Sequence, residues 1–134
     1  MSNRIGLVAS ILCCALLLAT PSANADQLVK VVDHPIVSAR SLDLEEIRRR
    51  VVLAASKRGW TIEADGQQQL KAIIAAGGGQ YQAVVAITYT DRAYSITLVE
   101  SKGFGQRGDT ISGRANRWIR NLERDIEVIL ASPA

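Results

Sequence analysis

Cysteine, histidine and aromatic residues are all scarce in this chain of 134 residues. There are two cysteines and one histidine, and aromatic residues make up 4% of the sequence. Cys13 and Cys14 both lie in an apolar run near the N-terminus. Removal of that run would leave no thiol, which excludes disulfides, thiolate zinc sites and a cysteine nucleophile. His34 has no second histidine to share a metal, so we expect no metal site and no cofactor.

Neither a strong charge bias nor a disordered composition is present. The net charge is +3, and 48% of the residues are hydrophobic. Such a mild charge predicts no nucleic-acid partner. The composition also argues against a disordered, collagen-like or coiled-coil chain, and the length suits one domain.

The first 25 residues have the features of a cleaved secretory signal peptide. Arg4 is followed by an apolar run over residues 5–19, and Pro21 ends that run. Residues 23–25, Ala-Asn-Ala, form a small-x-small cleavage site before Asp26. We therefore predict export to a bacterial periplasm, with membrane association as an option but no integral span after cleavage.

Two alternatives to a cleaved signal remain. An uncleaved anchor is less favoured because the apolar run is short for a membrane span. A lipoprotein is less favoured because a lipid-attachment cysteine is expected after a small residue, whereas Leu12 precedes Cys13.

The remaining chain is predicted to form an extended arm over residues 26–40 and one domain over residues 41–132. Leu28 to Val32 resemble a short strand, which we expect Asp33-His34-Pro35 to interrupt, because Pro35 disfavours a helix at His34.

An amphipathic helix is predicted over residues 42–58. Asp43 and Glu46 have capping-box spacing, with Ser41 as a competing N-cap, and Gly59 is suited to end the helix. Its apolar stripe consists of Leu44, Ile47, Val51 and Ala55.

Four strands of alternating polarity should follow, over residues 60–65, 69–76, 83–90 and 94–99. Their short connections predict an antiparallel meander. A second helix is predicted over residues 112–132, with Ala115, Trp118, Ile119, Leu122, Ile126 and Ile129 on its buried side. The expected fold is α+β, with both helices on one face of a four-stranded antiparallel sheet and an extra N-terminal edge strand as an option. Trp60 and Trp118 are expected to anchor the interface between sheet and helices.

A glycine-rich loop precedes the second helix. Gly103-Phe104-Gly105-Gln106-Arg107-Gly108 matches G-x-G-x-x-G, a spacing that binds pyrophosphate in βαβ units. Here the preceding strand belongs to a meander and no strand follows the helix, so we interpret the loop as a connector.

Arginines are concentrated around the second helix. Arg107, Arg114 and Arg117 are candidates for binding an anionic ligand near the helix N-terminus. Arg120 and Arg124 continue the basic face, and a solvated surface is the simpler interpretation. Arg48-Arg49-Arg50 point three ways on a helix and predict no patch.

Several short motifs resemble a family of small, uncharacterised bacterial envelope proteins, many of them lipoproteins. The similarity spans most of residues 36–130. Its motifs are Arg58-Gly59-Trp60, Tyr94-Ser95-Ile96, Glu100-Ser101, Asn116-Arg117-Trp118-Ile119, Asn121-Leu122 and Asp125-Ile126. The resemblance implies an envelope location and a fold but no activity. Asp26 stands where family members carry a lipid-attachment cysteine, and Ser112 where they carry a histidine.

The sequence predicts a non-enzymatic domain with a binding or structural role in the envelope. It contains no histidine pair or nucleophile elbow, so no catalytic residue is assigned. The expected partner is an envelope protein or an anionic envelope component. The alternative is an anion-binding module that uses Arg107, Arg114 and Arg117.

Overall fold

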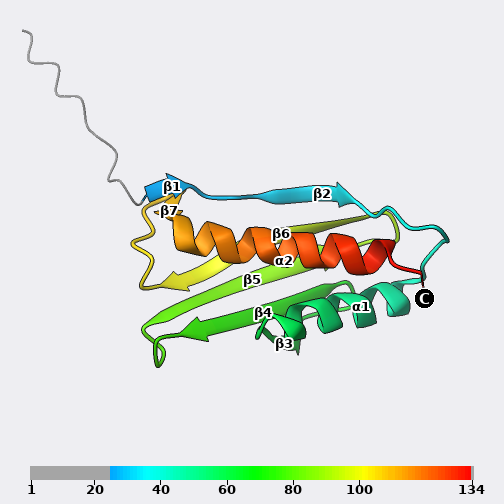
Figure 1. The fold of residues 1–134 in the computed structure, drawn as a ribbon, viewed down its shortest axis with the longest axis horizontal. Coiled ribbons are helices and arrows are strands. Elements are labelled where there is room, and N and C mark those ends of the chain that lie inside the picture. Colours follow the sequence, from blue (N-terminus) through cyan, green and yellow to red (C-terminus); the bar gives the residue numbers. More distant parts are fainter. Residues whose placement is uncertain (1–24, 134) are drawn as a thin grey trace, which may run out of the picture.

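The structure is a computed structural model that describes residues 25–133; nearly all of the predicted signal peptide lies outside the described residues. Two helices lie side by side across one face of an antiparallel sheet (Figure 1). In chain order the elements are β1 (Ala25–Gln27), β2 (Val31–Pro35), α1 (Leu44–Lys57), β3 (Thr61–Ala64), β4 (Gln69–Ala76), β5 (Tyr81–Tyr89), β6 (Ala93–Lys102), β7 (Thr110–Ser112) and α2 (Gly113–Ala131).

The main sheet has five strands rather than the predicted four. Its order is β2-β6-β5-β4-β3, and every neighbouring pair is antiparallel. The predicted meander is therefore present as β3 to β6, and the optional N-terminal edge strand is β2. A second sheet, which the sequence did not predict, pairs β1 with β7.

Strand β2 corrects the prediction that Asp33-His34-Pro35 interrupts this segment. These three residues form most of the strand, which pairs with β6 through a register shift between Val31 and His34. Proline fits because β2 is an edge strand and needs few backbone donors. Asp33 takes up the irregularity with a left-handed φ of 48°, a conformation that aspartate tolerates better than most residues.

A side chain caps the start of each helix. The Asp43 carboxylate accepts a hydrogen bond from the backbone N–H of Glu46 at 2.8 Å, so Asp43, not Ser41, caps α1. Ser112 caps α2 and accepts from the N–H of Arg114 at 3.3 Å. Because its hydroxyl serves as a cap, Ser112 has a clear local role at the start of α2.

The core lies between the two helices and the sheet. Alternate residues of β4, β5 and β6 point to the helices; Leu70 faces Ile87 across one strand pair, and Ile87 faces Ile96 across the next. Trp60 and Tyr94 are buried, whereas Trp118 is half-buried. Leu44 was predicted to be in the buried stripe, but it is exposed and is the first residue of α1. Within residues 25–133, no helix covers the other face of the sheet (Figure 1).

Candidate functional site

The three arginines predicted to bind an anion do not share one environment. Arg107 lies in the loop before β7, where its backbone pairs with Thr110. The Arg114 guanidinium stacks on the rings of Tyr81 and Trp118, at 4.6 and 5.4 Å from their centroids. Arg117 is exposed on α2. Cation–π packing gives Arg114 a structural role at this point.

The N-terminus of α2 already has a carboxylate beside it. A Cβ on Gly113 would lie 2.6 Å from Oδ2 of Asp26, so this carboxylate is in contact with the first turn of the helix. A negative charge in this position interacts favourably with the helix dipole. An anionic ligand here would be repelled by Asp26, which argues against the helix N-terminus as its site.

The glycine-rich loop is shaped by packing. Gly103 has a φ of 83°, and a Cβ added there would lie 2.3 Å from the carbonyl oxygen of Gln80. Phe104 is buried and makes an edge-to-face contact with Trp118, with ring centroids 5.1 Å apart. The loop follows an antiparallel strand, which fits its interpretation as a connector.

His34 lies in β2 rather than in a loop, and its side chain faces α2. Its Nδ1 is 3.5 Å from Glu123 Oε1, and its Nε2 is 3.9 Å from Glu127 Oε2. Its ring packs against that of Tyr94 in a tilted arrangement, with centroids 5.0 Å apart. The histidine therefore joins the edge strand to α2. Within residues 25–133, no group of three or more histidine or carboxylate side chains is placed to hold a metal ion.

Residues of the sequence motifs meet at the junctions between elements. Arg58, just after α1, forms an ion pair with Asp125 of α2, and this hydrogen-bonded contact raises the pKa of Arg58 above its ordinary value. Asn116 is buried, donates to the carbonyl of Gln27 at 2.8 Å and accepts from the N–H of Val29 at 2.9 Å. These contacts give the motifs structural roles.

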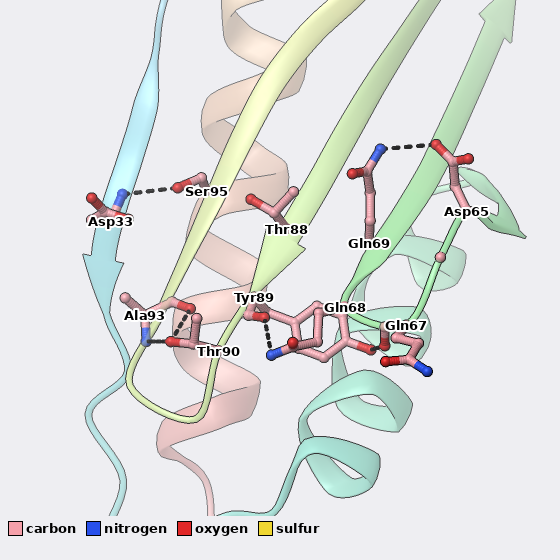
Figure 2. Close-up of a pocket in the computed structure, with 11 residues that line it drawn as sticks. Asp33, Asp65, Gln67, Gln68, Gln69, Thr88, Tyr89, Thr90, Ala93 and Ser95 are labelled. Atoms are coloured by element: carbon pink, nitrogen blue, oxygen red, sulfur yellow. Dashed lines mark hydrogen bonds between the residues drawn. The ribbon is translucent and has the colours of Figure 1, made fainter.

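A polar cleft lies on the face of the sheet that the helices leave uncovered. Its volume is about 400 Å³, which lies within the range of small-molecule sites. Figure 2 shows it spanning the strands, from Asp33 on β2 at one side to Asp65 in the β3–β4 turn at the other. Ser95 of β6, Thr88 of β5 and Gln69 of β4 lie between these two aspartates. The residues next to them along the strands are buried in the core, so these three side chains point to the opposite face of the sheet.

Hydrogen bonds hold the walls of this cleft (Figure 2). The Asp33 N–H donates to Ser95 Oγ at 2.9 Å, and Gln69 Nε2 donates to Asp65 Oδ2 at 2.9 Å. At the end of the sheet, Gln68 Nε2 donates to the carbonyl of Tyr89 at 3.2 Å, and the Tyr89 hydroxyl donates to the carbonyl of Gln67 at 3.3 Å. The site is thus preformed, which lowers the entropy lost when a ligand binds.

The lining of the cleft has a definite chemistry. Its charged side chains are the carboxylates of Asp33 and Asp65, and its other polar groups are hydroxyls and carboxamides. No lysine or arginine lines it among the described residues. Such a lining suits a ligand that carries positive charge and hydroxyl groups.

Sequence reasoning did not find this cleft. Gln67 and Gln68 lay between two predicted strands, and Gln69 was only the first residue of the strand predicted over residues 69–76. Thr88 and Ser95 were recognised only as outward-facing strand residues. The sequence did contain a signal for a cleft. Thr88 and Ser95 are small hydroxyl residues on the outward face of two strands, and they leave space beside the side chains of Gln67, Gln68 and Gln69. The register that aligns Thr88 with Ser95 had to be known first.

No family model, curated protein or solved structure matches the chain. None of the helices in the described residues is long and apolar enough to span a membrane.

Proposed function

We propose that this chain is an exported, non-enzymatic binding domain of the bacterial envelope, and that its ligand is a small hydroxylated amine held in the polar cleft. Export follows from the Arg4, apolar-run and Ala-x-Ala features of the N-terminus. The resemblance to small envelope proteins points to the same location.

One observation carries the choice of ligand: both charged groups that line the cleft are carboxylates. Asp33 and Asp65 lie on opposite sides, so an ammonium group can approach either one while the hydroxyls of the ligand meet Thr88, Ser95 and the glutamine amides. This separation also supports a binding role, since neither carboxylate has a second titratable group of the cleft beside it for acid–base catalysis.

The anion-binding alternative with Arg107, Arg114 and Arg117 is the weaker proposal. The Asp26 carboxylate lies at the helix N-terminus where the anion was expected, and Arg114 is engaged with two aromatic rings.

The test compares glucosamine with glucose, because the two sugars differ by one amino group. We expect glucosamine to shift the backbone amide resonances of Thr88, Thr90 and Ser95 in an NMR titration, and glucose to bind more weakly. Loss of one carboxylate, in Asp33→Asn or Asp65→Asn, removes an interaction worth about 1 kcal/mol and should weaken binding about fivefold. Glu63→Gln and Glu100→Gln remove exposed carboxylates outside the cleft and are the matched controls.

Equal binding of the two sugars would show a neutral saccharide site and refute the proposed role of the amine. Absence of shifts with either sugar, together with an absence of shifts with spermidine, would refute the cleft as an amine site.

A further inference from the structure

The outer surface of the helix layer has a chemistry opposite to that of the cleft. Helices α1 and α2 lie antiparallel (Figure 1). Residues of both helices line a shallow groove between them. Leu53 of α1 and Val128 of α2 line this groove and are 47% and 61% exposed. Large apolar side chains are thus exposed at the centre of the layer.

Basic side chains surround these two apolar residues. Arg49 and Lys57 flank the groove on α1, and Arg124 flanks it on α2. Arg117 and Arg120 extend the row along the exposed side of α2. We call these five basic residues, together with Leu53 and Val128, the basic helical face.

Most of this positive charge has no ion-pair partner among the described residues. In the described part of the chain, Lys57, Arg117, Arg120 and Arg124 take part in no ion pair, while Arg49 shares Glu46 with Arg50. The exposed carboxylates of the two helices are Glu45 and Glu127, and that of Glu127 lies 3.9 Å from His34 Nε2. Asp125 and Glu123 contact Arg58 and His34.

We propose that the basic helical face docks on a bilayer of anionic phospholipids. Arg117, Arg120 and Arg124 are spread over about 10 Å of helix rather than converging on a point, so one small anion cannot contact all of them. A charged plane can contact them together, and each basic residue near it contributes about fivefold to binding. Leu53 and Val128 would then enter the headgroup region.

Other occupants fit this face less well. A second copy of the chain would place like charges opposite one another, which disfavours a symmetric dimer through this face. Residues 1–24 contain no aspartate or glutamate, so the N-terminal part of this chain does not supply the complementary charge.

The experiment measures co-sedimentation with vesicles of phosphatidylcholine alone and of phosphatidylcholine mixed with phosphatidylglycerol. The protein begins at Ala25, so that it contains every described strand and helix but not the apolar N-terminal run, and circular dichroism melting verifies that each variant is folded. We expect binding to the anionic vesicles only, and loss of binding between about 50 mM and about 500 mM salt.

A charge-matched pair of variants locates the binding face. Replacing Arg117, Arg120 and Arg124 by glutamine should lower the partition coefficient about a hundredfold. Replacing Lys71, Arg92 and Lys102 by glutamine removes the same charge from the sheet and its connections and should change it less than threefold. Equal losses in the two variants, or no binding to anionic vesicles at the lower salt concentration, would overturn the proposal. Either result leaves the amine site in the cleft untouched, because the cleft lies on the opposite face of the sheet.

Discussion

The guanidinium of Arg50, in the middle of α1, donates hydrogen bonds to the carbonyl oxygens of Ile129 and Ser132 at the end of α2. The distances from Nη1 are 2.8 and 2.7 Å, and Nε donates to Glu46 at 3.0 Å. Arg50 is only 7% exposed. Arg50 of α1 therefore donates hydrogen bonds to carbonyls at the C-terminus of α2, where the last carbonyls of a helix lack partners within it. It also brings a positive charge to the C-terminus of α2, which is the negative end of the helix dipole.

Truncation of Arg50 should destabilise the domain strongly. Arg50→Ala leaves Glu46 without its buried partner and removes the donor to two carbonyls of α2, so we expect a loss of about 3 kcal/mol in the free energy of unfolding. Urea denaturation measures it. Arg49→Ala is the control, because Arg49 is exposed and should contribute about 0.5 kcal/mol or less. Similar losses in the two variants would contradict the assigned role.

Asn116 should be required for the attachment of β1. Its side chain both donates to and accepts from the backbone on either side of Leu28, so Asn116→Ala leaves the carbonyl of Gln27 and the N–H of Val29 without these part-buried hydrogen bonds. We expect a loss of about 2 kcal/mol and faster hydrogen exchange at the β1–β7 pairing, measured by NMR. Asn121→Ala is the control. Unchanged exchange at β1 and β7 in Asn116→Ala would refute this role.

Alanine at Gly103 should be much more harmful than alanine at Gly105. Both glycines have a positive φ, so each substitution costs about 1 kcal/mol from the backbone alone. The Cβ at Gly103 would also meet the carbonyl oxygen of Gln80, whereas nothing lies within 4 Å at Gly105. We therefore expect a further loss of at least about 1 kcal/mol for Gly103→Ala, measured by thermal denaturation. Equal losses would show that the contact with Gln80 relaxes freely.

Local signals were sufficient to predict most elements of this fold. Asp43 was predicted as a cap of the first helix, and α1 begins at the next residue. Alternating polarity and short turns predicted strands β3 to β6 in their observed order. These features depend on residues close together in the sequence, and for that reason they can be recognised without a structure.

Features that depend on distant partners were missed. Arg50 has the same local surroundings as Arg48 and Arg49, and only its position beside the end of α2 makes it a buried donor. Pro35 led us to predict an interruption where β2 lies. The proline is compatible with this strand only because the strand is at the edge of the sheet, and the sequence did not show that position. The cleft likewise requires β2, β6 and β5 to be aligned before Asp33, Ser95 and Thr88 come together.

Tyr94 should make the protein less stable in alkali. Its buried hydroxyl donates to the carbonyl of Glu123 at 3.2 Å, and burial, followed by the charges of Glu123 and Glu127, raises its pKa well above the ordinary value. Unfolded tyrosine ionises near pH 10 while the folded phenol stays protonated, so the native state then binds more protons than the unfolded state. The stabilising effect is complete below pH 10, and it declines by about 1.4 kcal/mol for each pH unit as the pH rises toward the folded pKa.

The comparison of wild type with Tyr94→Phe isolates this residue from the other groups that titrate in alkali. Near pH 8 the variant should be less stable by about 1 kcal/mol, because one hydrogen bond is lost. Above pH 10 the wild type loses stability faster than the variant, since phenylalanine cannot ionise, and the difference between the two should shrink and then reverse. Urea denaturation between about pH 8 and about pH 11 measures both curves. Parallel curves would show that the pKa of Tyr94 is the same in the folded and unfolded states, and that its burial beside two glutamates does not govern its ionisation.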